Sequence, residues 1–188
     1  MTTPFVLRLA AASDFASIAA ITNHYIRTTA IHFGYEDVRE DELRAAWSDR
    51  SVPCPWLVME VGGEIAGYAK AGSWRTRTAY RWITETGIYL APPFCGRGLG
   101  EPLYRRLCDV LRVQGFHAAI GGIALPNPAS VRLHERLGFV ACGVVPRAGR
   151  KFDAWHDVGF WQLLLHDERH VPGELASAES AFGKTGGP

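Results

Sequence analysis

A glycine-rich turn constrains this chain more than any other feature. The turn, Cys95-Gly96-Arg97-Gly98-Leu99-Gly100, follows a predicted strand from Tyr80 to Leu90 that is rich in aromatic and β-branched residues. A predicted helix follows it, with Pro102 in its first turn, where a missing N–H group is tolerated, and Gly115 at its end. Glycines at such a junction let backbone N–H groups converge on an anion, and the helix N-terminus adds partial positive charge. The turn is therefore a candidate phosphate site, with a plain connector as the alternative.

The spacing of the glycines excludes two common phosphate-binding motifs. The dinucleotide pattern G-x-G-x-x-G is not met, because the glycines stand at positions 96, 98 and 100 and Glu101 follows them. The P-loop pattern also fails, because no lysine follows Gly100. A turn of the form x-x-x-G-x-G therefore needs support from the rest of the chain.

The rest of the pattern predicts an α/β (α+β) domain with a mixed sheet flanked by helices. We expect strands at 6–9, 56–61, 64–69, 80–90, 116–125 and 155–165. Helices are expected at about 14–27 and 40–47, between the turn and Gly115, and between an Asn127 cap and Gly138. The order β-α-α-β-β-β-α-β-α-β differs from the strict alternation of a Rossmann fold or a TIM barrel. We predict one domain over residues 1–170 and a flexible tail over 171–188, where the sequence is small, polar and aperiodic.

Composition narrows the function classes. The chain has 188 residues, 47% hydrophobic with six Trp, which is unlike a disordered protein. A net charge of +1 gives little attraction for nucleic acid, and no apolar run approaches the roughly 20 residues that span a membrane. No secretory signal is visible, so we expect a cytoplasmic protein with reduced cysteines. The four Cys and seven His lack zinc-ligand spacing, so no metal is expected.

Several segments beyond the turn carry a resemblance to a known family. The chain resembles the GNAT superfamily of N-acetyltransferases, whose signature [QR]-x-x-G-x-[GA] lies at this strand–helix junction, and most closely its phosphinothricin and methionine sulfoximine acetyltransferase branch. The similarity covers residues 5–165, and the block Trp155–Gln162 is specific to the branch. The matching segments are Asn23–Ile26, Pro55–Val58, Gly98–Gly100, Leu125–Asn127, His134–Glu135 and Trp155–Gln162. It implies a mostly antiparallel central sheet and a homodimer.

The resemblance also implies acetyl-CoA as co-substrate, held mainly by backbone groups. Amides of the turn would bind the pyrophosphate, the strand end would bond the pantetheine arm, and Asn127 would contact the pantetheine or the thioester end. The residues expected to bind acetyl-CoA are Ile88, Tyr89, Leu90, Gly96, Arg97, Gly98, Leu99, Gly100, Glu101 and Asn127. Cys95 departs from the family pattern, which has Gln or Arg there. We expect this change to weaken acetyl-CoA affinity without abolishing function.

Two residues are candidates for proton transfer. Glu85 lies five residues before Leu90, and the matching Glu of the branch is assigned as general base, so we expect it to deprotonate the acceptor amine. A structural carboxylate paired with Arg81 is the alternative. His134 stands where many family members carry a Tyr that protonates the thiolate, and an imidazole pKa of about 6.5 suits that task. A hydrogen-bonded helix histidine without a catalytic role is equally compatible with the sequence.

The acceptor site is predicted from three further residues. Arg75 and Arg77 alternate in a predicted loop and could hold two acidic groups, and in the resembled branch this segment lines the acceptor site with the aromatic at Phe33. A solvated basic loop is the alternative. Two departures from the branch, Asp37 in place of a Pro and Asp153 in place of a small residue, are candidates for altering the acceptor.

Three functions are compatible with these residues. The first is transfer of acetyl from acetyl-CoA to the α-amine of a small amino acid analogue of the phosphinothricin or methionine sulfoximine type. The second is the same chemistry on a protein N-terminus or a polyamine. The third is a non-catalytic acyl-CoA-binding protein, for which Cys95 is the main support.

Overall fold

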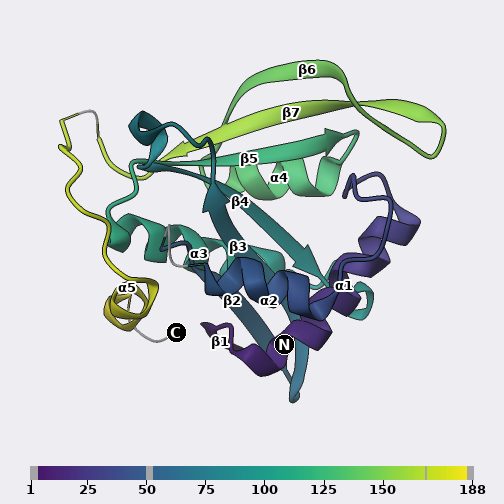
Figure 1. Ribbon diagram of the computed structural model, residues 1–188, viewed down its shortest axis with the longest axis horizontal. Helices are drawn as coiled ribbons and strands as arrows, with labels where there is room; N and C mark the ends of the chain where they lie inside the picture. The colour runs from purple at the N-terminus through teal and green to yellow at the C-terminus, as the bar shows by residue number, and fades with distance from the viewer. Residues whose placement is uncertain (1–3, 50–52, 168, 186–188) are drawn as a thin grey trace.

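The fold is a single seven-stranded sheet with helices on both faces (Figure 1). The computed structural model describes residues 4–49, 53–167 and 169–185. The strands are β1 (Val6–Leu9), β2 (Trp56–Val61), β3 (Glu64–Ser73), β4 (Ile83–Leu90), β5 (Ala118–Leu125), β6 (Val140–Lys151) and β7 (Ala154–Leu164). The helices are α1 (Phe15–Thr28), α2 (Glu40–Ser48), α3 (Gly100–Gln114), α4 (Pro128–Arg136) and α5 (Ala178–Lys184). None of the helices in these ranges is long and apolar enough to cross a membrane.

The sheet is mixed and mostly antiparallel, as predicted. Its strand order is β1-β2-β3-β4-β5-β7-β6, and only the β4–β5 pair is parallel. A parallel pair needs a long crossover connection, and α3 provides it. The glycine-rich turn therefore lies at the carboxyl end of β4, where the chain leaves the sheet.

The two parallel strands stay paired for only part of their length. The pairing of β4 with β5 runs from Ile83 opposite Ala118 to Thr86 opposite Gly121. Beyond this point β5 continues alongside β7, while β4 continues alongside β3. Figure 1 shows β4 and β5 starting together on the left and separating toward the right. In the part of the chain that the structure describes, the split leaves one side of β4 without a strand partner from Gly87 onward.

Alternation along β2 separates the two halves of the core. Leu57 and Met59 are fully buried against α3, whose own buried positions include Leu103, Leu107 and Leu111. Their neighbours Trp56 and Val58 point to the opposite face and pack with Phe15 and Ile18 of α1. Successive strand residues face opposite sides, so one short apolar strand serves both layers.

Local signals at helix ends are confirmed. Gly115 has φ +96° and ends α3 in the left-handed conformation that favours glycine. Asn127 accepts a hydrogen bond from the Ser130 N–H at 3.1 Å, and Pro128 occupies the first position of α4.

Two predictions about the second half of the chain are wrong. The expected element order lacks β6, which pairs with β7 but is interrupted by register shifts between Ala141 and Gly143 and between Val145 and Gly149. These irregularities break the alternation by which a strand is recognised in a sequence. The segment from residue 171 is also not a loose tail, because it contains α5; residues 186–188 of the predicted tail lie outside the described residues.

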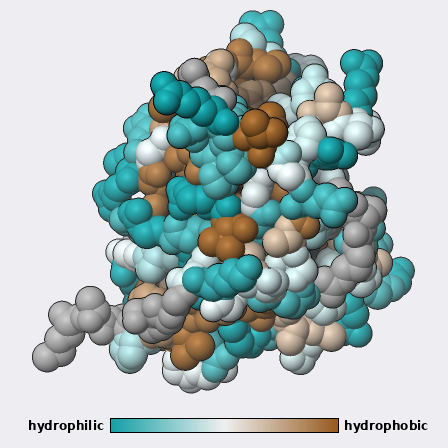
Figure 2. All heavy atoms as spheres, turned by 90° about the vertical axis from the view of Figure 1, so that its left-hand side faces the viewer, coloured by the Kyte–Doolittle hydropathy of each residue, from teal (hydrophilic) through white to brown (hydrophobic). Residues whose placement is uncertain are grey.

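Helix α5 is held against α3 by specific contacts. Ala181 is fully buried, and the Arg106 guanidinium lies 4.4 Å from the centre of the Phe182 ring. Arg106 also donates a hydrogen bond to the Thr185 carbonyl oxygen at 2.6 Å. The side of the molecule that carries α5 is mostly hydrophilic, with apolar residues in small separate groups (Figure 2). The amphipathic signal of a seven-residue helix is too short to stand out in the sequence.

Candidate active site

Two cavities meet where β4 and β5 separate. The turn cavity, of about 370 Å³, is lined by the glycine-rich turn, the second half of β4, the end of β5 and α4. The α2 cavity, of about 420 Å³, lies between the end of α2 and the middle of β3 and β4. Both are lined by Thr86, Gly87, Tyr89 and Gly122, which belong to the split itself. A ligand in one cavity can therefore reach a ligand in the other through the gap in the sheet.

The geometry of the turn suits a diphosphate. Gly96 and Gly98 have φ values of +74° and +76°, and a Cβ at either position would meet nothing within 4 Å. The backbone conformation, and not crowding, therefore requires glycine there. The amides precede the N-terminus of α3, and the side chains of Arg132 and Arg136 line the same cavity. Backbone donors and cations together match the charge of a pyrophosphate.

Eight of the ten residues predicted to bind acetyl-CoA line the turn cavity. The side chains of the other two lie elsewhere. Leu99 is buried in the core, and the Arg97 guanidinium lies 5.3 Å from the centre of the Phe94 ring. Neither residue is part of the cavity lining.

Cys95 lies at the rim of the turn cavity with its side chain exposed. Its Sγ atom is 3.5 Å from the Tyr25 hydroxyl oxygen, and Tyr25 donates a hydrogen bond to the Leu90 carbonyl at 2.7 Å. The cysteine therefore contacts a residue that ties α1 to the end of β4.

Glu85 lies at the junction of the two cavities. Its side chain lines the α2 cavity, and a Cβ on Gly122 would be 3.4 Å from Glu85 Oε1, so the carboxylate lies over the split. Burial raises the pKa of Glu85, and the positive charges of Lys70 and Arg75 partly oppose this rise. Among the described residues, the Glu85 carboxylate has no ion-pair or hydrogen-bond partner. The alternative pairing with Arg81 is not formed, because the Arg81 guanidinium lies 4.0 Å from the centre of the Trp82 ring.

Lys70 is a site residue that the sequence patterns did not indicate. It lies on β3 directly opposite Gly87 and lines the α2 cavity together with Glu85. Its Nζ is 4.6 Å from the centre of the Trp56 ring, and burial lowers its pKa while the charge of Glu85 opposes this. A lone lysine inside an otherwise apolar strand was the available signal, because lysine is rarely buried without a partner.

His134 lies in a buried hydrogen-bond network on the opposite side of the sheet from α2. Its Nδ1–H donates to the Ser130 carbonyl at 2.8 Å, and its Nε2 accepts from the Tyr104 hydroxyl at 3.0 Å. The Tyr104 oxygen is also 2.6 Å from Thr86 Oγ1. Burial lowers the pKa of His134, so the imidazole is neutral near pH 7. Although the ring lines the turn cavity, both of its nitrogens are already used.

The three predicted acceptor-binding residues do not line either cavity. Arg75 is exposed beside Trp74, 5.0 Å from the ring centre, and acts on Glu85 only through its charge. Arg77 is exposed in the same loop. Phe33 packs on β6, where a Cβ on Gly149 would be 2.6 Å from its ring.

The two sequence departures lie outside both cavities. Asp37 accepts a hydrogen bond from Arg27 Nε at 2.8 Å, and Asp153 forms an ion pair with Arg150 at 2.9 Å. Each acid therefore has a local surface partner.

Comparison with known proteins agrees with this architecture. Residues 18–139 match the acetyltransferase (GNAT) family. The chain belongs to the GNAT acetyltransferase family. This GNAT chain is 43% identical over 159 residues to the phosphinothricin N-acetyltransferase of Streptomyces viridochromogenes, covering 85% of the chain and 87% of the relative. It is 39% identical over 168 residues to the L-methionine sulfoximine/L-methionine sulfone acetyltransferase of Salmonella typhimurium, covering 88% and 97%.

A solved structure extends the match to three dimensions. The phosphinothricin acetyltransferase of Sinorhizobium meliloti, solved in complex with acetyl-CoA, superposes with a TM-score of 0.87 at 32% identity. The match covers 93% of this GNAT chain and 95% of that structure. The protein is therefore an N-acetyltransferase of the phosphinothricin and methionine sulfoximine branch.

Proposed function

We propose that this GNAT protein transfers acetyl from acetyl-CoA to the α-amine of a small amino acid analogue of the phosphinothricin or methionine sulfoximine type, with Glu85 as general base. The position of the Glu85 carboxylate over the split between the two cavities is the observation that supports this most directly. The names of the relatives support the substrate class. The complex of the structural neighbour supports acetyl-CoA as the donor.

The turn cavity is suited to hold acetyl-CoA. The amides around Gly96 and Gly98 and the N-terminus of α3 would bind the pyrophosphate. From Gly87 to Tyr89, β4 has no strand partner on the β5 side among the described residues, so its backbone groups there are available for the pantetheine arm. The Leu90 carbonyl already accepts a hydrogen bond from Tyr25. Acetyl-CoA supplies an activated acyl carbon, and these groups would direct that carbon to the gap beside Glu85.

Glu85 is suited to take a proton from the acceptor. The attacking nitrogen needs a free electron pair, and a primary ammonium is almost fully protonated at neutral pH. A carboxylate whose pKa is raised by burial is a stronger base than an ordinary glutamate. Glu85 takes a proton from the acceptor ammonium, directly or through a water molecule, and the free amine attacks the acyl carbon. The carbon–sulfur bond then breaks, CoA leaves as a thiolate, and the second proton lost by the nitrogen reaches that thiolate through solvent.

We assign His134 a positioning role in place of the predicted acid role. A general acid must release a proton, but the neutral His134 ring donates its only N–H to a backbone carbonyl. A Cβ on Gly121 would be 2.4 Å from His134 Nε2, so the ring packs directly on the last residue of β5 that pairs with β4. This contact supports the point at which the strands part.

An acceptor screen tests the proposal. Purified protein and acetyl-CoA are incubated with L-methionine sulfoximine, phosphinothricin, spermidine or short peptides, and released thiol is measured. We expect thiol release with the two amino acid analogues. Reaction with peptides alone would exclude the small-molecule substrate, and calorimetric binding of CoA without thiol release for any acceptor would indicate a non-catalytic protein.

The cations Lys70 and Arg75 near Glu85 disfavour a polyamine. A cytoplasmic location and a homodimer stay predictions.

A further inference from the structure

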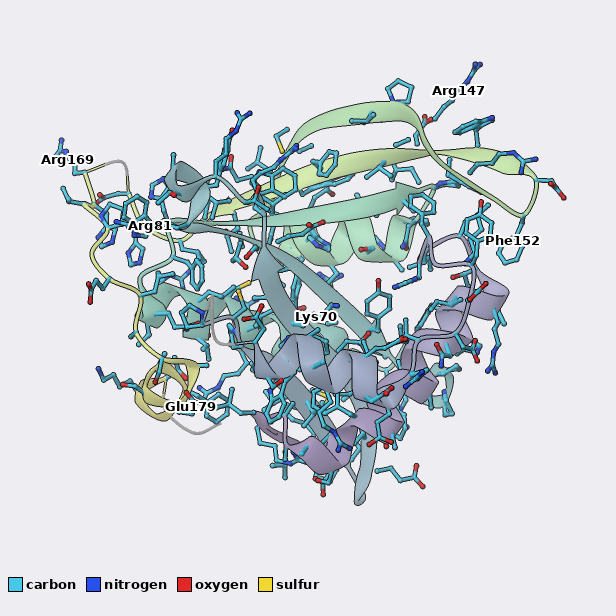
Figure 3. The ribbon with its side chains drawn as sticks, in the orientation of Figure 1. Lys70, Arg81, Arg147, Phe152, Arg169 and Glu179 are labelled. Carbon is cyan, nitrogen blue, oxygen red and sulfur yellow. The ribbon has the colours of Figure 1, made fainter. Side chains whose placement is uncertain are left out.

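The α2 cavity is lined by Lys70, whose ammonium group has no carboxylate of a described residue within ion-pair distance. Lys70 lies near the centre of the molecule, between α2 and the sheet (Figure 3). Its Nζ contacts the face of Trp56 and forms no ion pair or hydrogen bond among the described residues. A buried charge without a charged partner is unfavourable, since desolvation is not repaid by a partner. Such a group is stabilised when a ligand brings the opposite charge.

The register of the sheet fixes how Lys70 and Glu85 are arranged. Lys70 is opposite Gly87, and Glu85 is opposite Gly72, so the two side chains are diagonal neighbours on the same face of the β3–β4 pair. Each influences the pKa of the other, although their charged atoms are more than 4.0 Å apart. The space between them is part of the α2 cavity.

This arrangement matches the two charges of an α-amino acid. The amino and carboxylate groups of such a molecule are attached to one carbon atom, so an amine directed at Glu85 carries its carboxylate a short distance away. Lys70 lines the cavity together with Glu85, whereas Arg75 and Arg77 lie in the exposed loop beyond β3 and outside the cavity lining. The two arginines would then be left for a distal acidic group of the acceptor.

We propose that Lys70 binds the α-carboxylate of the acceptor and thereby selects amino acids over simple amines. The inference rests on the proposed function, because it names the group that orients the acceptor at Glu85. Lys70 takes no part in proton transfer; it is a specificity-determining residue.

The test compares two acceptors that differ only in this carboxylate, L-methionine sulfone and its decarboxylated form, 3-(methylsulfonyl)propylamine. The discrimination ratio is kcat/KM for the acid divided by kcat/KM for the amine. We expect Lys70→Met to lower this ratio by about 10-fold to 100-fold, as for loss of one charged hydrogen bond, chiefly through KM of the acid. The intrinsic reactivities of the two amines cancel when the variant is compared with the wild type.

The controls separate charge from packing. Arg81→Met removes another cation stacked on a tryptophan, at the edge of the molecule and outside both cavities, and should leave the ratio unchanged (Figure 3). Lys70→Arg should restore part of the discrimination. If Lys70→Met melts far below the wild type, Lys70→Gln takes its place in the same comparison.

Three outcomes would overturn the inference. An unchanged ratio in a folded Lys70→Met or Lys70→Gln variant would exclude carboxylate binding by Lys70. A wild type that acetylates both compounds equally well would do the same while leaving the proposed function intact. A wild type that acetylates neither this acid nor any other amino acid would overturn the proposed function as well.

Discussion

Thr86 of β4 and Gly121 of β5 form the last pair of the parallel ladder, and the sheet opens beyond them. Both residues are contacted by side chains of α3 and α4: Thr86 Oγ1 is 2.6 Å from the Tyr104 hydroxyl, and the His134 ring packs on Gly121. Tyr104 and His134 are hydrogen-bonded to each other at 3.0 Å, so α3 and α4 together brace the opening. The gap through which the two cavities communicate is therefore a fixed part of the fold.

Replacing Glu85 with Gln should remove the base without disturbing the fold. We expect kcat to fall by about 10²-fold to 10⁴-fold, the usual contribution of a general base, while calorimetry shows nearly unchanged CoA affinity. Glu64→Gln, an exposed carboxylate at the start of β3, is the matched control and should behave as wild type. Equal turnover in Glu85→Gln would remove Glu85 from the mechanism.

The pH dependence of kcat/KM for the wild type should report the ionisation of Glu85. Burial raises the pKa of Glu85, so its ionised, active form is lost as the pH falls through a value above the ordinary ~4.3 of glutamate. The acid limb of kcat/KM should therefore lie above pH 4.3 and disappear in Glu85→Gln. A limb at or below the ordinary value would contradict the burial argument.

Gly98→Ala should weaken CoA binding more than it weakens the fold. Alanine at φ +76° is strained by roughly 1–2 kcal/mol, and the strain would rotate amides away from the pyrophosphate. Gly62→Ala is the matched control, because Gly62 also has a positive φ of +60° and open space around it but lies in the β2–β3 hairpin. Both variants should lose similar stability in denaturant titration, and only Gly98→Ala should lose CoA affinity by calorimetry. Equal affinity in the two variants would argue against the turn as the pyrophosphate site.

His134→Gln should affect stability more than turnover. We expect a loss of about 1–3 kcal/mol in the free energy of unfolding, because the Tyr104 hydroxyl would lose one of its two partners and keep only Thr86. The value of kcat should fall less than tenfold. A loss of 100-fold or more in kcat would restore the acid role to His134.

The neutral state of His134 in the folded protein should also be visible in how the free energy of unfolding depends on pH. Burial lowers the pKa of His134 in the folded state, so the unfolded chain binds a proton first as the pH falls. The wild type should thus lose stability from about pH 6.5, the unperturbed value, down to the depressed native pKa, and His134→Gln should lack this component. Urea titrations of both proteins between pH 5 and 8 measure it.

Phe182→Ala tests whether α5 is part of the domain. Phe182 packs under the Arg106 guanidinium and against the core, so its loss should lower the free energy of unfolding by roughly 1–3 kcal/mol. Turnover should be unchanged, because α5 lines neither cavity. Ser180→Ala, on the exposed side of the same helix, should be neutral. No change in the urea midpoint of Phe182→Ala would mean that α5 does not contribute to stability.

The sequence by itself determined most of the local elements of this protein, β6 and α5 excepted, and the family to which it belongs. Asn127, Pro128 and Gly115 mark helix ends through their own backbone and side-chain chemistry, and these effects act within a few residues. The glycine-rich turn is local in the same sense, because the left-handed conformations at Gly96 and Gly98 favour glycine wherever the turn is placed.

The tertiary structure alone decided how the site is assembled. Lys70 and Glu85 become neighbours through the register of β3 on β4, and the two cavities exist because β4 leaves β5 after Thr86. The opposite pKa shifts of Lys70 and Glu85, the neutral state of His134 and the packing of α5 on α3 likewise depend on residues distant in the chain. Desolvation and pairing register are properties of the folded arrangement, so no pattern of neighbouring residues could specify them.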